Sequence, residues 1–127
     1  MILVLVFFNF LLGLVFIGKA SAEMRVESKA QIEDFIIYQA MKQGVSVELA
    51  LGIAHCESNL NPLAKAKTSS ASGIFQFIRG TWNSTTSSLL WEKGQDVFDP
   101  RLNIIAGIHL LKKDGPKHWE CYNLDMI

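Results

Sequence analysis

The chain has 127 residues, with 12 basic and 12 acidic side chains and a formal net charge of zero. This length supports one small domain and no more. The balanced charge excludes the strong attraction to phosphate on which most nucleic-acid-binding proteins rely, so we expect no nucleic-acid partner.

Residues 1–22 have the composition of an export signal. Residues 1–18 are almost entirely apolar, and residues 20–22 read Ala-Ser-Ala, a small-x-small pattern that signal peptidases recognise. We therefore expect cleavage before Glu23. Because no Lys or Arg precedes the apolar core, an uncleaved anchor that associates residues 1–18 with the membrane is the alternative. Both interpretations predict that the rest of the chain is periplasmic or extracellular.

Residues 23–127 are the predicted mature domain, which contains two cysteines, Cys56 and Cys121. A domain of this size has a small core and gains from a covalent crosslink, and an oxidising compartment favours a single disulfide. The alternative is a zinc site that adds His55 and His118 to the cysteines. Adjacent helical residues point about 100° apart, which disfavours that site. We expect no metal and no cofactor.

In the first half of this domain, apolar residues recur at three- and four-residue spacing, the period of an amphipathic helix. The spacing predicts a helix over residues 30–42 that Gly44 ends. It also predicts a second, largely apolar helix over residues 46–56, with Ser46 as its N-cap. Residues 58–72 are rich in turn-forming residues and are predicted to form a loop.

In the second half, the apolar spacing predicts a short helix over residues 73–82, followed by a polar surface turn over residues 83–88. Asp99 and Pro100 are typical of a helix start, since the carboxylate caps and proline suits the first helical position. This helix is predicted to reach about Lys113. We find no strand pattern and no internal repeat, so the sequence predicts a mainly α domain.

Glu57 is the candidate catalytic residue. It lies at the carboxyl end of a predicted apolar helix, where the helix dipole and desolvation both raise the pKa of a carboxyl group. A raised pKa suits a general acid that protonates a leaving oxygen near neutral pH. Its position alone is equally compatible with an ordinary exposed carboxylate, which is the more frequent case.

Three motifs accompany Glu57 in a recognisable order. Residues 57–62 read E-S-N-L-N-P, residues 71–76 read A-S-G-I-F-Q, and residues 103–107 read N-I-I-A-G, followed by His109 and Leu110. This pattern resembles the soluble lytic transglycosylase family of the lysozyme-like superfamily, which has E-S-x-x-N-P, A-S-G-L-M-Q and N-I-x-x-G-x-x-Y-L. The resemblance covers roughly residues 50–111. It implies a small lysozyme-like helical domain with a cleft.

The resemblance also implies roles for individual residues. Glu57 matches the catalytic acid and base of the family. Ser72, Gly73 and Gln76 match the segment that lines the cleft beside the scissile bond, and Asn103 matches the Asn that closes the cleft behind the Glu.

The chain departs from the family pattern at several positions. Phe75 replaces a Met, and His109 stands in place of the family Tyr, with one spacer fewer. The loop before the second motif is longer by about one residue, so Thr68 and Ser69 both compete for the hydroxyl that the family places there. Tyr122 is a candidate for a later substrate-binding Tyr of the family.

A single carboxylate suffices for the chemistry that the resemblance implies, whereas ordinary glycosidases use two. Glu57 would protonate the oxygen between N-acetylmuramic acid and N-acetylglucosamine, and then deprotonate the muramyl C6 hydroxyl, which closes a 1,6-anhydro ring. Asp96 and Asp99 are the other carboxylates that could approach Glu57. Two alternatives are a hydrolase on the same bond, as in goose-type lysozyme, and a catalytically idle wall-binding protein.

The partner implied is the peptidoglycan glycan strand, bound by a monomer. The three tryptophans and Tyr122 could stack on sugar rings, but we expect at least two of these four to fill the core. Lys65 and Lys67 lie in the predicted loop and could meet anionic wall polymer, although a solvated loop is the more ordinary interpretation.

Overall fold

The computed structural model describes residues 27–123. The predicted export signal lies outside these residues. The described part of the chain forms helices, with isolated β-bridges but no strand, as the sequence predicts. The helices are α2 (Lys29–Gln43), α3 (Val47–Ser58), α4 (Arg79–Ser88), α5 (Pro100–Asp114), the 3-10 helix η1 (Gly115–His118) and α6 (Glu120–Asn123). In the described range, no helix is both long and apolar enough to cross a membrane.

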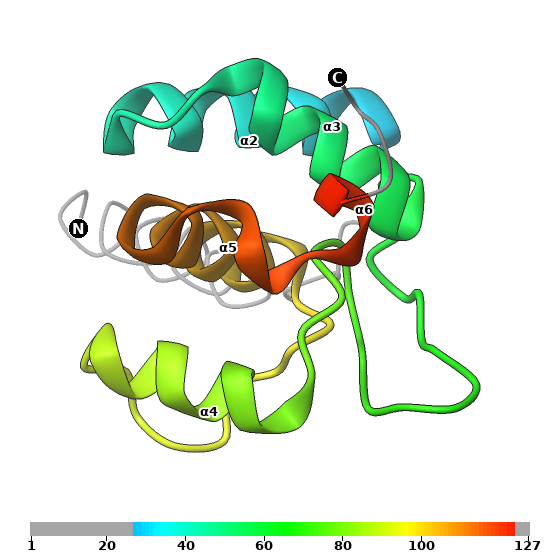
Figure 1. The fold of residues 1–127 in the computed structure, drawn as a ribbon, viewed down its shortest axis with the longest axis vertical. Helices are drawn as coiled ribbons and strands as arrows, with labels where there is room; N and C mark the ends of the chain where they lie inside the picture. Colours follow the sequence, from blue (N-terminus) through cyan, green and yellow to red (C-terminus); the bar gives the residue numbers. More distant parts are fainter. Residues whose placement is uncertain (1–26, 124–127) are drawn as a thin grey trace, which may run out of the picture.

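Figure 1 shows α5 between two layers, with the α2–α3 pair on one side and α4 on the other. Helix α2 packs against both α3 and α5, and α4 packs against α5. The core lies where these layers meet. Its fully buried isoleucines come from α2 (Ile32 and Ile36), α3 (Ile53), the turn before α4 (Ile74) and α5 (Ile104 and Ile108). The four-residue spacing in α2 and α5 places each pair on one helix face, and each buried side chain contributes about 1.5–3 kcal/mol.

Helices α2 and α3 begin and end close to where the sequence predicts. Ser28 and Gln31 form a capping box at the start of α2, and Gly44, with φ of 73°, ends it. Ser46 caps α3 through the N–H of Leu49. Helix α3 continues to Ser58, so Glu57 belongs to its last turn.

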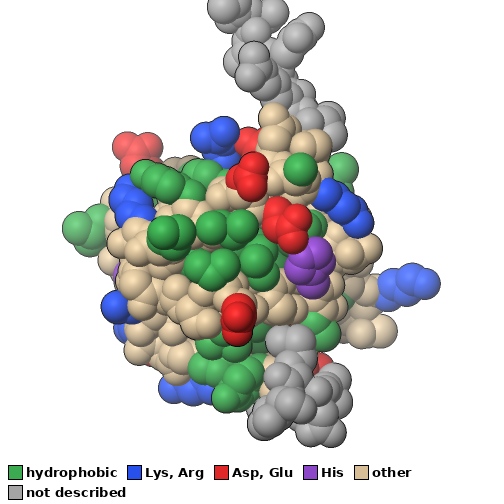
Figure 2. Space-filling model, turned by 90° about the horizontal axis from the view of Figure 1, so that it is seen from above, with side chains coloured by type: hydrophobic (Ala, Val, Ile, Leu, Met, Phe, Trp, Pro, Cys, Tyr) green, Lys and Arg blue, Asp and Glu red, His purple; other side chains and the backbone are tan. Residues whose placement is uncertain are grey.

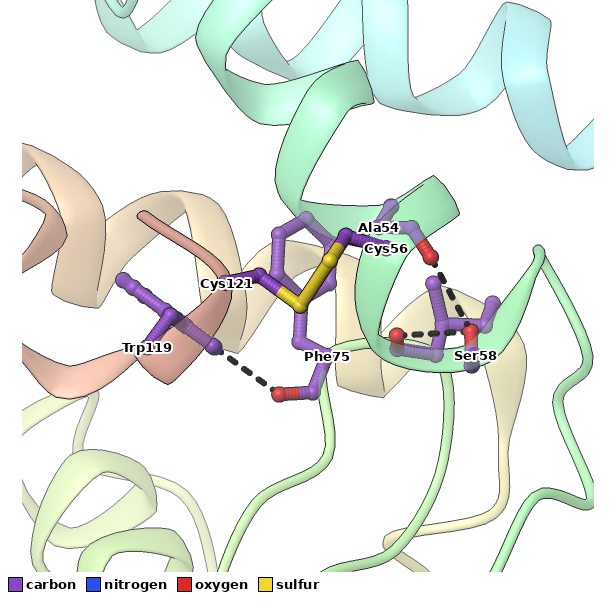
Figure 3. Close-up of a disulfide and its surroundings, with 7 residues drawn as sticks. Ala54, Cys56, Ser58, Phe75, Trp119 and Cys121 are labelled. Carbon is purple, nitrogen blue, oxygen red and sulfur yellow. Dashed lines mark hydrogen bonds between the residues drawn. A yellow bond between two sulfur atoms is a disulfide. The ribbon is translucent and has the colours of Figure 1, made fainter. Parts of the chain in front are cut away.

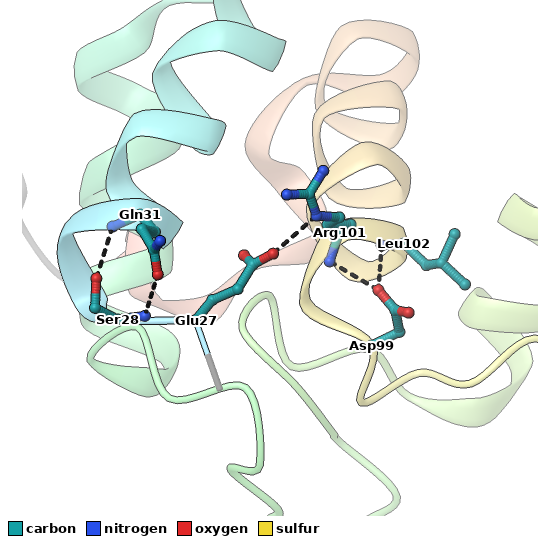
Figure 4. A network of polar contacts seen from close by, with 6 residues as sticks. All are labelled: Glu27, Ser28, Gln31, Asp99, Arg101 and Leu102. Carbon is teal, nitrogen blue, oxygen red and sulfur yellow. Dashed lines mark hydrogen bonds and ion pairs between the residues drawn. The ribbon is translucent and has the colours of Figure 1, made fainter. Parts of the chain in front are cut away.

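Helix α5 also has the predicted start. Oδ1 of Asp99 accepts hydrogen bonds from the backbone N–H groups of Arg101 and Leu102, and Pro100 occupies the first helical position. Figure 4 shows that Arg101 also reaches the start of α2, where its Nε donates to Oε1 of Glu27 over 2.8 Å. These contacts fix the amino-terminal ends of α2 and α5 relative to each other.

The helix predicted over residues 73–82 is wrong. Ser72 and Phe77 exchange two backbone hydrogen bonds of 3.0 Å, which closes a tight turn instead of a helix. Gly73 and Gln76 have positive φ values of 79° and 50°, and Ile78 is extended. Positive φ is incompatible with a right-handed helix, so α4 cannot begin before Arg79.

The polar surface turn predicted over residues 83–88 is also wrong, because α4 continues to Ser88. Hydroxyl groups of this helix donate to its own carbonyls: Thr86 to the carbonyl of Trp82 over 3.0 Å, and Ser88 to that of Thr85 over 2.8 Å. Trp82, Thr85 and Thr86 form its buried face. The buried face therefore has helical spacing, but two of its three residues are threonines that a search for apolar residues passes over.

The outer face of the α2–α3 pair mixes residue types. Seen from above in Figure 2, apolar side chains gather over the middle of the face, with acidic side chains around them. The large exposed apolar residues of α2 are Tyr38 and Met41. Nε2 of His55 on α3 lies 3.2 Å from Oε1 of Glu33 on α2, which joins the two helices across their exposed sides. Scattered apolar side chains of this kind are ordinary on a solvated surface.

Candidate active site

Glu57 lies in the last turn of α3, and the next residue fixes that turn to the rest of the molecule. The hydroxyl of Ser58 hydrogen-bonds to the carbonyl of Ala54 within the helix, at 3.2 Å, and to the carbonyl of Ile74, at 2.8 Å. Figure 3 shows both contacts. The second one joins the end of α3 to residues 72–77, which we call the cleft turn.

Asn103 of α5 holds the cleft turn from behind. Its side chain is fully buried, its Oδ1 accepts the N–H of Phe75 over 2.8 Å, and its Nδ2 donates to the carbonyls of Val97 at 2.8 Å and Ser72 at 3.4 Å. A Cβ on Gly73 would overlap the Asn103 amide and lie 2.7 Å from the Val97 oxygen. The backbone can therefore pass this close to Asn103 only with glycine at position 73.

Phe75 anchors the centre of the cleft turn in the core. Its ring rests on Gly107 of α5, where a Cβ would come within 2.6 Å of the ring. Its carbonyl accepts a hydrogen bond of 2.8 Å from Nε1 of Trp119, and the two aromatic rings pack edge to face. The sequence left Trp119 as a residue that either stacks on a sugar ring or fills the core; it does not reveal this hydrogen bond to the cleft turn.

The structure contains the disulfide between Cys56 and Cys121, with the two Cα atoms 6.0 Å apart. As Figure 3 shows, it joins the end of α3 to α6. Because both thiols are used in this bond, they are not thiolate ligands for the zinc alternative. Among residues 27–123 there is also no group of three or more His, Cys, Asp or Glu side chains placed to hold a metal ion.

The surroundings of Glu57 raise its pKa above the ordinary value of a glutamate. Burial is the main cause, and the negative charge of Glu120 adds to it, while a hydrogen bond with the backbone of Cys121 opposes both. Glu120 is the carboxylate that sequence reasoning missed. Asp96 and Asp99, the expected candidates, instead accept backbone hydrogen bonds at the start of α5.

Gln76 and Glu120 line one pocket of about 210 Å³ between the cleft turn and the carboxyl-terminal helices. Nε2 of Gln76 donates to the carbonyls of Ala64 at 3.0 Å and Gly73 at 2.9 Å. These bonds fix the amide, and no donor among residues 27–123 is hydrogen-bonded to its oxygen. Tyr122 lies on α6 with its side chain 41% exposed, and it does not line this pocket.

A second pocket, of about 370 Å³, lies on the other side of the cleft turn and shares Phe77 with the first. Ser70 and Ser72 are the hydroxyl residues that line it. The sequence left Thr68 and Ser69 as the two candidates for the hydroxyl before the second motif. Ser69 accepts the N–H of Ala71 in a local turn, and neither residue lines the pocket.

His109, which stands in place of the family Tyr, does not line the first pocket. Leu110, the third residue after Gly107 on helix α5, lines it. Nε2 of His109 lies 3.1 Å from the hydroxyl of Ser88 on α4 and joins those two helices instead.

Two tryptophans belong to the core, as predicted: Trp82 is 6% exposed and Trp119 is 4% exposed. Trp82 also forms part of the wall of the second pocket. Its indole N–H is engaged by the carbonyl of Gln95 at 3.1 Å, so the side chain offers a ring surface and no free donor.

The model of the family described as the transglycosylase SLT domain matches residues 34–118, a span that includes Glu57, the cleft turn and Asn103. No solved structure matches the chain significantly. Because the family match covers more than half of the sequence, the chain belongs to the transglycosylase SLT family of the lysozyme-like superfamily, and its function is of the lytic transglycosylase type that acts on peptidoglycan.

Proposed function

We propose that this protein is an exported lytic transglycosylase that cleaves the bond between N-acetylmuramic acid and N-acetylglucosamine and leaves a 1,6-anhydromuramyl end. The observation that carries the proposal is the environment of Glu57. This carboxyl group is half-buried at the end of α3, and burial and Glu120 raise its pKa.

In the first step, Glu57 acts as the general acid. A raised pKa keeps a larger fraction of the carboxyl group protonated near neutral pH. The proton passes to the glycosidic oxygen as the bond from that oxygen to C1 of the muramyl residue breaks. The acetamido group of the same sugar stabilises the positive charge that develops at C1.

In the second step, the same carboxylate acts as the general base. It takes the proton of the muramyl C6 hydroxyl while that oxygen bonds to C1, so the ring closes and Glu57 is again protonated. Burial raises the pKa of Glu57 because it disfavours the charged form, and for the same reason it makes the carboxylate a stronger base. The leaving sugar keeps the first proton, and no water is consumed.

The cleft turn supports this proposal through its rigidity. The hydrogen bond from Ser58 holds the turn against the end of α3, and the one that Asn103 accepts from Phe75 holds it against α5. Gln76 presents a fixed amide in the pocket that Glu120 also lines. Groups held in this way can position a sugar without a large loss of conformational entropy on binding.

Glu120 is proposed to act on Glu57 through its charge and not as a second catalytic carboxylate. Retaining glycosidases place two carboxyl groups about 5–5.5 Å apart, with the second as the nucleophile. Glu120 is an exposed residue at the start of the short helix α6. An exposed, solvated carboxylate is well suited to modulating the pKa of its neighbour.

Mass spectrometry of the products tests the proposed outcome. Purified peptidoglycan is digested with the protein, and with the Glu57→Gln variant as a blank. Muramyl ends lighter by one water than reducing ends support the proposal. Reducing ends would show the goose-type hydrolase reaction instead, and wall that binds the protein but yields no new ends would show an idle wall-binding protein.

The export route through residues 1–22 is a separate proposal. Cell fractionation with an antibody against the chain tests it, and amino-terminal sequencing of the exported form shows whether it begins at Glu23. A chain found only in the cytoplasm would contradict this part of the proposal.

A further inference from the structure

The second pocket carries a positive charge whose placement follows from the backbone. Lys65 forms an antiparallel bridge with Ser72, and Ser72 forms another with Phe77. Residues directly opposite in antiparallel bridges point to the same side, and so do residues two positions along an extended segment. Lys65, Ser72 and Phe77 therefore share a face, which Ser70 and Arg79 join, and all five line the pocket.

The three chain segments that carry this face are held tightly together. The N–H of Gly73 donates to the carbonyl of Ala64 over 2.8 Å, and that of Ala66 donates to the carbonyl of Ala71 over 2.9 Å. The hydroxyl of Ser70 accepts the N–H of Arg79 over 2.9 Å. Lys65 lies in a loop and Arg79 lies at the start of α4. These hydrogen bonds nevertheless hold the backbone of both residues beside the same pocket.

Among the described residues, the lining of this pocket contains both cations and no carboxylate. Within residues 27–123, the ion pairs are formed by Arg101, His55 and His118, so neither Lys65 nor Arg79 has an acidic partner there. Two unpaired cations beside one concave surface favour an anionic ligand.

The rest of the pocket suits a sugar ring. Apolar surface comes from Phe77, Trp82, Val97 and Phe98, and neutral polar groups come from Ser70, Ser72, Asn83 and Gln95. Aromatic surface with a few polar groups is the usual composition of a site for an amphipathic small molecule. A ligand for the whole pocket therefore combines a sugar with a negative charge.

We propose that Lys65 and Arg79 select glycan strands by a carboxylate that the strand carries, and that they bind it in this pocket on the far side of the cleft turn from Gln76 and Glu120. This inference rests on the proposed function. Of the two alternating sugars, N-acetylmuramic acid bears the lactyl group, whose carboxyl group is free in peptide-free strands. In peptide-bearing strands the carboxyl group of the lactyl group forms an amide bond with the stem peptide. The stem peptide then supplies the carboxylates instead.

The test compares four substrates: peptide-free strands and peptide-bearing strands, each in its native form and after carbodiimide coupling to methylamine, which makes the carboxylates neutral. The proteins are the wild type, Lys65→Gln, Arg79→Gln and the control Lys42→Gln. Lys42 lies on α2 above the ring of Tyr38 and lines neither pocket. All three substitutions remove one positive charge.

We expect the wild type to have a higher KM on the neutralised strands. Lys65→Gln and Arg79→Gln should each raise KM about threefold to fivefold on native strands, with kcat unchanged, because exposed charge pairs are worth up to about 1 kcal/mol. Neither substitution should change KM on the neutralised strands. Lys42→Gln should have the KM of the wild type on all four substrates. An effect confined to peptide-free strands identifies the lactyl carboxylate, and one confined to peptide-bearing strands identifies the peptide.

Equal KM values of the wild type on native and neutralised strands would overturn the inference. So would variants that are equally impaired on both forms, since that result indicates a structural defect. Kd values measured with Glu57→Gln, which binds without cutting, separate this inference from the proposed function. A Kd that depends on the strand charge, in a protein whose wild type cuts nothing, would support the pocket and contradict the proposed function.

Discussion

Glu57 is surrounded by groups that act on its pKa in opposite directions. Burial and the charge of Glu120 raise the pKa, and the hydrogen bond with the backbone of Cys121 lowers it. Glu120 and Cys121 are adjacent on α6, and Cys121 is covalently joined to Cys56, the residue before Glu57. The pKa of Glu57, the proposed catalytic residue, therefore depends on a segment 63 positions later in the chain, which sequence proximity does not reveal.

The Glu120→Gln variant tests this dependence. Removing the charge of Glu120 lowers the pKa of Glu57, so the acid loses its proton at a lower pH. Because Glu57 must be protonated for the first step, we expect the alkaline limb of the pH–kcat profile to move to lower pH. Glu48→Gln, an exposed substitution at the other end of α3, should leave the limb in place. A limb that does not move in Glu120→Gln would contradict the role of Glu120.

Single residues could be predicted from the sequence where a motif specifies them. Gly73 and Asn103 lie in recognisable motifs, and the structure brings them together. The third residue after Gly107, where the family pattern has its Tyr, is Leu110 and not His109, and Leu110 lines the first pocket. Glu120 could not be predicted, since its charge reaches Glu57 only through the fold.

The cleft turn is where local sequence and structure disagree most. Its apolar residues have helical spacing, yet Ile74 and Phe75 are buried by the turn itself and by contacts with α5 and Trp119. One such contact is the hydrogen bond that Phe75 N–H donates to Oδ1 of Asn103, which lies 28 residues away. The spacing of apolar residues indicates which of them are buried, but it does not determine which backbone conformation buries them.

Gly107→Ala tests how closely α5 supports this turn. The added Cβ would meet the ring of Phe75, so we expect a loss of about 1–3 kcal/mol in the free energy of unfolding and a lower kcat. Gly80→Ala is the matched control, because a Cβ there meets nothing within 4 Å and alanine favours a helix by up to about 1 kcal/mol. Urea unfolding measures both. A Gly107→Ala variant as stable as the wild type would contradict the packing described.

At the scale of the whole molecule, the disulfide closes the fold. It links residues 65 positions apart and joins the end of α3 to the carboxyl-terminal segment. The helical class, the bounds of α2, α3 and α5, and this pairing could all be predicted, because caps, periodicity and the number of cysteines report them directly. Helix α4 could not be predicted in this way, because Thr85 and Thr86 on its buried face do not count as apolar residues.

We expect the double variant Cys56→Ser/Cys121→Ser to lose about 4 kcal/mol in the free energy of unfolding, the value of the chain-entropy model for a loop of this length. It should also lose activity, since α6 is then free to move away from Glu57. Urea unfolding measures the first effect. A thiol assay on the denatured wild-type protein checks the premise, and two reactive thiols would refute it.

The account centres on Glu57 as the acid and base of strand cleavage. The most direct test is the rate at which Glu57→Gln releases soluble fragments from purified peptidoglycan, compared with Glu48→Gln on the same helix. We predict a fall of about 10²–10⁴-fold for Glu57→Gln, the usual contribution of general acid–base catalysis, and a wild-type rate for Glu48→Gln. A folded Glu57→Gln protein that solubilises wall within tenfold of the wild-type rate would contradict the account.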